Sequence, residues 1–237
     1  MKFRLLILFL SIFAMQGVAA ADEWDWNITP YLWAAGIDGD TSIGPIEANI
    51  SVDFEDLFNV LRGGALLRAE GMSERHGVFG DLVYLRLKEK NARDTIGGSL
   101  EVKMDTLIVE GAYFYRFNPK YALELGLRYW DFETTLVPAV IEKRVSSSDW
   151  TDAFVGFRMD SELSSRWSWL FRGNVGGGGS EIAAGLQLDF RRKFQNGNRL
   201  DIGLRLLDVE RQDDSGRAPT EVNASFQGLA VGYSFDL

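Results

Sequence analysis

The chain contains no cysteine and a single histidine among its 237 residues. Without thiols it forms no disulfide bonds and builds no thiolate metal site. A single histidine also leaves little of the side-chain chemistry that transfers protons near neutral pH. We therefore expect no metal site, no cofactor and no enzymatic activity.

Long hydrophobic runs are also missing. No segment offers the roughly twenty consecutive apolar residues that a transmembrane helix needs. The longest run, Leu5–Met15, follows Lys2 and Arg4 and leads into small residues, which is typical of a secretory signal peptide. We expect residues 1–20 to be removed after Ala20, or after Ala21. Any membrane-spanning part of residues 21–237 must then be built from strands.

Positive charge is in short supply, with 25 Lys and Arg against 34 Asp and Glu and a net charge of −9. Such a balance argues against a nucleic-acid partner. The 25 glycines and an aromatic content of 13% suit a curved sheet with aromatic girdles. The length of residues 21–237 suits one barrel and is short for two domains. We expect an all-β, single-domain chain.

Several segments alternate between apolar and polar side chains, which indicates strands with two unlike faces. Between Tyr121 and Tyr129, three leucines at odd positions alternate with Glu124 and Arg128. The same alternation runs through residues 107–117, 182–190 and 200–206. Each segment is about ten residues long, enough for a tilted strand to cross the hydrocarbon. The apolar face is expected to meet lipid and the polar face the lumen.

Two kinds of connection separate these segments. Four short polar turns, at residues 73–76, 118–120, 164–166 and 195–198, are expected to face the periplasm. Five longer links, at residues 38–61, 91–98, 137–149, 176–180 and 213–223, are expected to face outside. This division predicts an antiparallel up-and-down transmembrane β-barrel of ten strands, with eight or twelve as alternatives.

The first outer link is the most complex. Residues 46–52 alternate like a strand, and residues 53–61 have the period of a short amphipathic helix. Counting residues 46–52 as a spanning strand would make the total odd. We therefore interpret residues 38–61 as a long structured outer loop, which either folds over the barrel mouth or is an ordinary surface excursion.

The last nine residues carry a large apolar side chain at every odd position. This segment resembles the closing strand of Gram-negative outer-membrane β-barrels, in which the chain end serves as an assembly signal, here Tyr233, Phe235 and Leu237. Residues 29–39 (TPYLWAAGIDG) resemble the first strand of a group of uncharacterised proteobacterial outer-membrane barrel proteins. The resemblance implies a place in the cell outer membrane, with membrane lipid and the barrel assembly machinery as partners. It transfers no catalytic or binding residue.

The lone histidine lies in a predicted inner turn with two other polar residues, Ser73-Glu74-Arg75-His76. A catalytic triad is one interpretation, but adjacent turn residues do not easily converge on one substrate atom, so an ordinary polar turn is favoured. The glycine run at residues 176–179 lacks the lysine and helix of a phosphate-binding loop, and a hairpin tip explains it better.

Most of the tryptophans fall near strand ends, where indole rings sit at the headgroup level of a membrane. We assign Trp167 and Trp169, just after a short turn, to a periplasmic girdle, with a sugar-stacking site as the alternative. Trp24, Trp26, Trp33, Trp130 and Trp150 are expected to follow the same rule.

The predicted lumen faces carry charges of both signs. Because charges removed from water are costly unless paired, a balanced set predicts a cross-strand network that fills a narrow barrel. The network is expected to comprise Arg68, Glu70, Asp81, Glu110, Arg116, Glu124, Arg128, Arg158, Arg172, Asp189, Asp201 and Arg205.

These patterns together predict a monomeric, non-enzymatic outer-membrane barrel with a structural or surface-interaction role, or with a small ligand at its outer mouth. One alternative is a narrow diffusion pore or transporter. Another is a lipid-modifying enzyme that uses Asp131 or Glu133 near the outer rim. A third is a soluble periplasmic barrel, which would direct Leu123, Leu125 and Leu127 inward.

Overall fold

The computed structural model describes residues 24–43, 46–52, 61–93, 99–138, 144–213 and 220–237. The predicted signal peptide, residues 1–20, lies outside these ranges. The predicted short helix also lies outside them, except for Leu61, which begins a strand.

The described residues form eleven strands and no helix, so none of them belongs to a helix long and apolar enough to cross a membrane. The strands are β1 (Asp25–Ile43), β2 (Ile46–Val52), β3 (Leu61–Met72), β4 (His76–Arg93), β5 (Ser99–Arg116), β6 (Tyr121–Pro138), β7 (Arg144–Glu162), β8 (Trp167–Gly178), β9 (Ile182–Lys193), β10 (Arg199–Asp213) and β11 (Thr220–Asp236).

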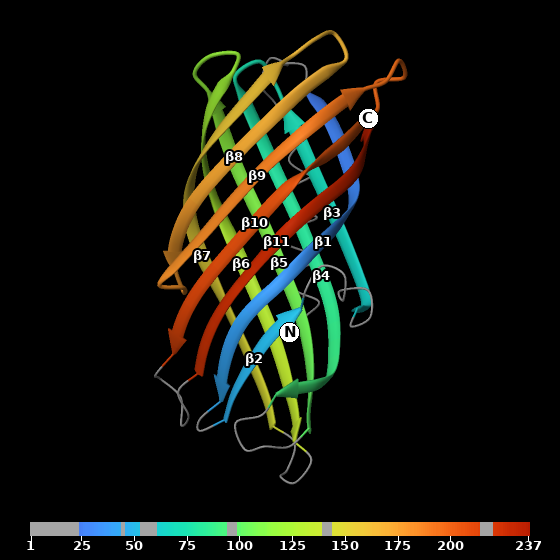
Figure 1. The fold of residues 1–237 in the computed structure, drawn as a ribbon. Coiled ribbons are helices and arrows are strands. Elements are labelled where there is room, and N and C mark those ends of the chain that lie inside the picture. The colour runs from blue at the N-terminus through green and yellow to red at the C-terminus, as the bar shows by residue number, and fades with distance from the viewer. Residues whose placement is uncertain (1–23, 44–45, 53–60, 94–98, 139–143, 214–219) are drawn as a thin grey trace.

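Ten of these strands form a closed antiparallel barrel. Strands β3 to β10 each pair with the next along the chain, β1 pairs with β3, and β1 also pairs with β11 to close the wall. Figure 1 shows the long, tilted strands wrapping around one axis. The predicted ten-strand, all-antiparallel barrel is confirmed.

The four short turns lie together at one end of the barrel with the C-terminus, at the top of Figure 1; we call this the turn end. Polar residues shape these turns. The Asn118 Oδ1 atom accepts hydrogen bonds from the backbone amides of Lys120 (2.8 Å) and Tyr121 (3.0 Å). Gly197, in the Asn-Gly turn, has a φ of 86°, which favours glycine.

The strands extend further than expected at the opposite end, which we call the loop end. Residues 144–149, expected in an outer link, belong to β7, and residues 38–43 belong to β1. The other three outer links are also shorter than predicted, since β4, β8 and β11 run into them. Strands of 17–19 residues are longer than the membrane crossing requires, and polar outward residues carry the excess beyond the apolar band.

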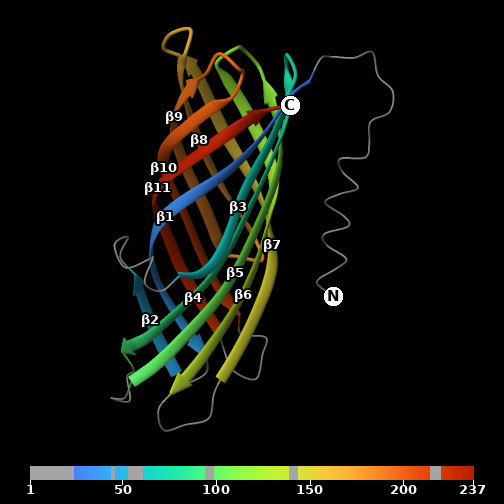
Figure 2. The same ribbon diagram turned by 90° about the vertical axis from the view of Figure 1, so that its right-hand side faces the viewer.

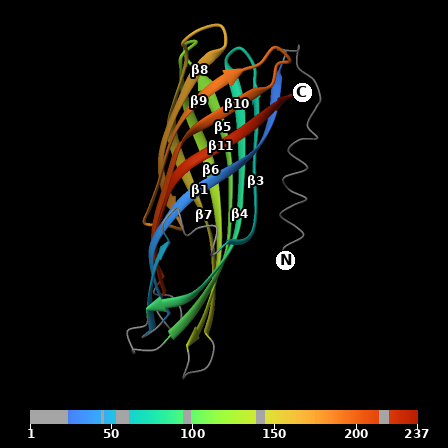
Figure 3. The same cartoon turned by 45° about the vertical axis from the view of Figure 1, so that its right-hand side comes forward.

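Strand β2 is a strand, as its alternation predicts, but it is not one of the ten. It pairs with residues 37–43 of β1 at the loop end. Strand β3 pairs with β1 only over residues 25–30, so residues 31–36 of β1 pair with β11 alone. Figures 2 and 3 show β1 and β3 side by side at the turn end and apart further along the barrel.

The two faces of each strand differ as the alternation requires. On β6, Leu123, Leu125 and Leu127 are 59%, 63% and 59% exposed, whereas Glu124 and Arg128 are 3% and 1% exposed. The leucines therefore form the outer surface and the charged residues lie inside. This arrangement is the reverse of a soluble barrel with an apolar interior, and that alternative is wrong.

Two layers of side chains fill the barrel. The charged layer lies toward the turn end, and the apolar layer lies beyond it toward the loop end. The apolar layer comprises Trp33, Ala35, Ile37, Val83, Leu85, Leu87, Met104, Ile108, Trp130, Phe132, Trp150, Ala183, Leu207, Val209, Ala224 and Phe226. The charged layer comprises Arg68, Glu70, Asp81, Glu110, Glu124, Arg128, Arg158, Arg172, Asp189, Arg191, Asp201 and Arg205, all buried.

Candidate functional site

The charged layer contains every member of the predicted lumen network except Arg116. Strand alternation places these residues on the inner face, and neighbouring strands bring opposite charges into register, as for Arg68 of β3 opposite Asp81 of β4 and Glu110 of β5 opposite Arg128 of β6. Arg116 is only half-buried at the turn end, where its guanidinium donates to the Pro119 carbonyl oxygen (3.5 Å).

Glu110 joins two arginines in the middle of this layer. Its Oε2 accepts a hydrogen bond from Arg128 Nε (2.7 Å), and its Oε1 accepts one from Arg172 Nη2. Arg172 Nε also donates to Glu124 Oε2 (2.7 Å). Arg128 and Glu124 lie four residues apart on β6. Each pairs with partners on other strands, and both belong to one connected set of ion pairs.

Further ion pairs cross the barrel between distant strands. Arg158 of β7 donates to both carboxylate oxygens of Glu70 on β3, at 2.7 and 3.1 Å. Arg68 of β3 lies 3.4 Å from Asp189 of β9. Because these contacts join opposite walls, side chains span the lumen at this level.

Tyr31 marks the border between the two layers. Its hydroxyl donates to Asp81 Oδ1 (2.8 Å) and accepts from Arg205 Nη1 (2.6 Å), while Arg205 Nη1 lies 2.5 Å from Asp81 Oδ2. The Arg205 guanidinium also lies 4.7 Å from the centre of the Trp33 ring. The Tyr31 hydroxyl thus hydrogen-bonds with charged groups of the charged layer, while the residue also belongs to the buried hydrophobic cluster that contains Trp33.

Aromatic rings also lie within the charged layer. The Arg172 guanidinium is 4.1 Å from the Phe79 ring centre, and that of Arg158 is 4.6 Å from the Phe114 ring centre. Stacking on a ring face stabilises a guanidinium that has left water. The layer is therefore a packed arrangement of ion pairs and rings, and a cavity of about 10 Å³ beside Glu110 and Arg128 has room for about one water.

The apolar layer corrects one sequence prediction. Trp33, Trp130 and Trp150 are 4%, 0% and 6% exposed and point into the barrel, so their assignment to the membrane interface is wrong. The rings of Trp130, Phe132 and Trp150 stack with centres 5.5–5.9 Å apart. Trp24 and Trp167 are exposed near the turn end, as expected for a girdle.

A buried carboxylate that the sequence analysis missed holds this layer to the link between β8 and β9. Asp152 is fully buried, accepts from Trp130 Nε1 (2.8 Å), and accepts from the Ser180 amide (2.8 Å) and hydroxyl (2.6 Å). Ser180 Oγ in turn accepts from Trp150 Nε1 (2.7 Å). The glycine run ends inside this arrangement, because a Cβ on Gly179 would lie 2.6 Å from that of Trp150.

Arg191 and Asp160 are two further members of the charged region that the sequence analysis missed. Asp160 Oδ1 lies 3.2 Å from Arg191 Nη1, and Asp160 Oδ2 lies 2.7 Å from Arg158 Nε. The sequence signal for the burial of Arg191 was its position on β9, because it continues the inward-facing series of Gln187 and Asp189.

The polar turn around the histidine lacks the geometry of a triad. Ser73 Oγ hydrogen-bonds with the backbone of His76, at 3.2 and 3.3 Å, and the His76 ring hydrogen-bonds with the Tyr113 hydroxyl (2.5 Å). No group of three or more His, Asp or Glu side chains in the described part of the chain could hold a metal ion.

The predicted assembly signal lies on the outer surface of β11 and at the chain end. Phe235 and Leu237 are 46% and 75% exposed, and the Tyr233 hydroxyl accepts from Asn198 Nδ2 (3.1 Å). Recognition of these residues by the assembly machinery stays a prediction.

Several solved structures of outer-membrane proteins are similar to this barrel. The barrel is similar to the outer membrane protease OmpT from Escherichia coli, with a TM-score of 0.51 and 6% identity over 94% of this chain and 99% of that chain. It also matches Ail, the attachment invasion locus protein of Yersinia pestis, in complex with the heparin analogue sucrose octasulfate (TM-score 0.40, 9% identity, 91% and 100% covered). The transport unit of the autotransporter AIDA-I from Escherichia coli matches as well (TM-score 0.42, 12% identity, 97% and 96% covered).

No protein-family model and no curated protein sequence matches the chain. At these identities the structural likeness establishes the fold alone: the chain has the fold of an outer-membrane β-barrel, which implies a lipid environment. The similarity to such barrels suggests the outer membrane as its location.

Proposed function

We propose that this protein is a resident of the cell outer membrane whose lumen is closed by its own side chains and which acts without enzymatic turnover. Its turn end faces the periplasm and its loop end faces outside. The observation that carries the proposal is the pair of packed layers, which fills the barrel from the Glu70–Arg158 ion pair at one level to Phe226 at the other.

A diffusion pore would need a continuous water path past both layers. Charged side chains that line water-filled pores are free to hydrate, whereas Arg128 and Arg158 are each 1% exposed and each form an ion pair with a buried carboxylate. The apolar layer adds a second obstacle, because stacked indoles exclude ions. These features favour the closed barrel over the narrow pore.

Planar-bilayer recording tests the closed lumen. The refolded protein, with insertion verified by its altered mobility on unheated gels, is expected to give no channel steps above background. A matched variant, F132A/F226A, removes two stacked rings of the apolar layer and leaves the charged layer intact, so it also stays closed if both layers seal the lumen. Reproducible ion-conducting steps in the unmodified protein would replace the proposal with a pore.

A lipid-modifying enzyme is tested by the mass of lipid A after overexpression. Asp131 and Glu133 both lie on the outward face of β6 near the loop end, and we propose that they take no part in catalysis. An unchanged lipid A mass is expected. A mass shift that disappears in the D131N/E133Q variant would show that the protein is an enzyme.

The length of the strands favours an interaction role at the cell surface. Beyond the apolar band, the outward faces of β4 to β7 continue with charged and polar residues, so the loop end stands clear of the hydrocarbon. Fractionation of intact cells and protease treatment from outside are expected to recover the protein with the outer membrane and to cut it only at loop-end links.

A further inference from the structure

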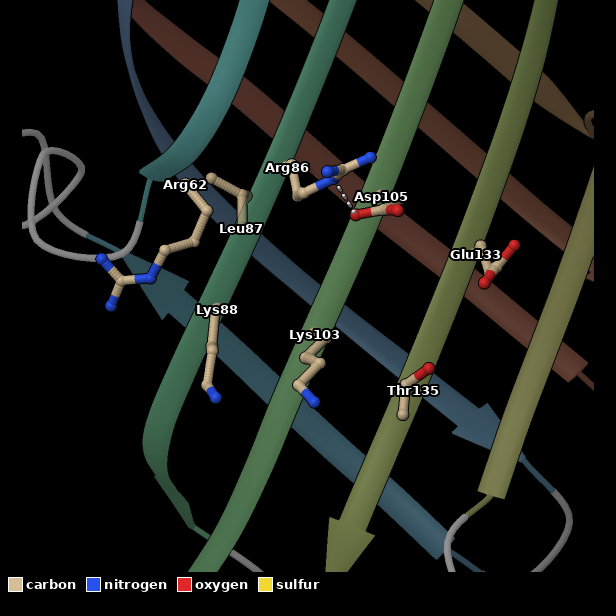
Figure 4. Close-up of a pocket in the computed structure, with 8 residues that line it drawn as sticks. All are labelled: Arg62, Arg86, Leu87, Lys88, Lys103, Asp105, Glu133 and Thr135. Atoms are coloured by element: carbon tan, nitrogen blue, oxygen red, sulfur yellow. Dashed lines mark ion pairs between the residues drawn. The ribbon is translucent and has the colours of Figure 1, made fainter.

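A cleft of about 240 Å³ lies on the outer wall of the barrel at the loop end, across β3, β4, β5 and β6. Figure 4 shows its lining side chains standing on these strands. Four of them are basic and two are acidic: Arg62, Arg86, Lys88, Lys103, Asp105 and Glu133.

The basic residues set this part of the wall apart from the rest of the loop-end surface. Near the loop end, the described outward side chains of the other strands are acidic or neutral and none is basic; the acids include Asp38 on β1, Asp149 on β7, and Asp208 and Glu210 on β10. Among the described side chains, basic groups on the outward loop-end surface therefore gather at the cleft, which favours the approach of an anion there.

The cleft lies directly above the apolar band. On β4, outward residues change from Leu82 and Tyr84 to Arg86 and Lys88. The Tyr84 hydroxyl accepts a hydrogen bond from Arg86 Nη2 (2.6 Å), and the guanidinium lies 5.7 Å from the Tyr84 ring centre. Since tyrosines of this kind sit at the level of lipid headgroups, Arg86 is held at the height of lipid phosphates.

The two lysines are held together rather than free. Glu101 accepts from both, with Lys88 Nζ 3.1 Å from Oε2 and Lys103 Nζ 3.1 Å from Oε1. Figure 4 shows their side chains running in the same direction on neighbouring strands. Each ammonium has three donors and uses one on Glu101, so donors from both lysines remain for a shared oxyanion.

Arg86 and Arg62 complete the basic edge of the cleft. Arg86 Nε is 3.3 Å from Asp105 Oδ1, an exposed ion pair that holds the guanidinium in place. Arg62 occupies the bulge between Leu61 and Gly63, and no carboxylate of the described residues lies within ion-pair distance of it.

We propose that this cleft binds the phosphorylated headgroup of a lipid in the outer leaflet. The lipid's acyl chains would lie against the apolar band below, while its phosphate oxygens accept hydrogen bonds from Lys88, Lys103 and Arg62. Basic pockets at the edge of the hydrocarbon bind anionic headgroups in this way. The inference goes beyond the closed-barrel function and rests on its placement in the outer membrane.

Native mass spectrometry of the refolded full chain in detergent, titrated with bis-phosphorylated lipid A, tests the proposal. At about 1 kcal/mol for each basic residue near a membrane surface, the K88Q/K103Q variant is expected to bind about 30-fold more weakly. Its fold is checked by mobility on unheated gels. The D105N variant, which removes a negative charge from the cleft, is expected to bind at least as tightly as the unmodified protein.

The matched control is K120Q/R166Q, which removes the same charge from exposed turns at the turn end and is expected to leave binding unchanged. The proposal is overturned if dephosphorylated lipid A binds equally well, if K88Q/K103Q binds normally, or if the control loses as much. Inorganic phosphate that binds as tightly as the lipid would assign the cleft to a soluble anion instead. Each of these results leaves the conductance test of the closed lumen unaffected.

Discussion

Glu110 and Glu101 show how burial decides what a carboxylate contributes. Each lies between two basic side chains, Glu110 between Arg128 and Arg172 and Glu101 between two lysines. Glu110 is buried at 2% exposure, while Glu101 lies in the water-exposed part of the wall. Water therefore screens the ion pairs of Glu101, whereas those of Glu110 are shielded from water.

We predict that Glu110→Gln destabilises the barrel by about 3–5 kcal/mol, because it leaves two buried guanidinium groups short of a counter-charge. Glu101→Gln makes the same chemical change at the exposed site and is expected to leave stability nearly unchanged. Urea unfolding from lipid vesicles, followed by tryptophan fluorescence, measures both. Equal effects of the two changes would contradict the assignment of Glu110 to a dehydrated network.

Two glycines on neighbouring strands test the packing of the interior. A Cβ on inward-facing Gly126 would overlap the Phe154 ring and lie 2.7 Å from the Gly111 carbonyl oxygen, whereas a Cβ on outward-facing Gly111 meets nothing within 4 Å. We predict that Gly126→Ala costs about 1–3 kcal/mol and that Gly111→Ala changes stability little. The same unfolding assay applies, and a tolerated Gly126→Ala would indicate a loosely filled lumen.

Tryptophan positions show what a residue pattern does and does not reveal. Trp130 follows Tyr129 on β6, and its even number places it with Glu124 and Arg128 on the inner face, so strand parity carried the signal for its burial. Asp152 was harder to find, since the residues before it were expected in an outer link. Its role depends on Trp130 and Ser180, which come together only in the folded barrel.

Strand β6 displays the membrane-crossing pattern most clearly. Its outward residues are apolar from Leu123 to Leu127 and become acidic at Asp131, so the middle of the apolar band lies near Leu125. The strand then continues to Pro138 with Phe132 and Thr134 still buried inside.

We predict that Leu125→Arg destabilises the reconstituted protein by about 2–4 kcal/mol, because it places a charge near the bilayer midplane. Thr151→Arg, on the outward face of β7 beside Tyr129, is the control near the interface and is expected to cost about 0–1 kcal/mol. Unfolding from vesicles measures the difference. A Leu125→Arg effect no larger than that of Thr151→Arg would show that the apolar band does not contact acyl chains.

The sequence predicted the turn end well and the loop end poorly. Short turns are marked by local residues such as Asn118 and Gly197, whose side chain or backbone freedom shapes the turn itself. The loop-end boundaries depend instead on pairing between strands, as for residues 144–149, whose polar composition gives no sign that they pair with β6. The alternation of apolar and polar residues in β2 predicts a strand, but its pairing with β1 depends on the three-dimensional fold.

At the scale of the whole molecule, two kinds of side-chain packing fill the narrow lumen. Paired charges occupy the half toward the turn end, and stacked rings and aliphatic side chains occupy the half toward the loop end. Counting inward charges predicted the first half. The second half was not predicted, because apolar residues on both faces of a strand obscure the alternation that identifies the lumen side.

The central claim is that the apolar face of each strand meets lipid while the charged and aromatic side chains fill the barrel. Its most direct test reconstitutes the unmodified protein in vesicles whose acyl chains carry a photoactivatable group, and maps the adducts by mass spectrometry. We predict adducts at Leu123, Leu125 and Leu127 and none at the intervening Glu124 or at Arg128. Adducts on the charged positions, or a protein that stays in the aqueous phase without any, would contradict the account.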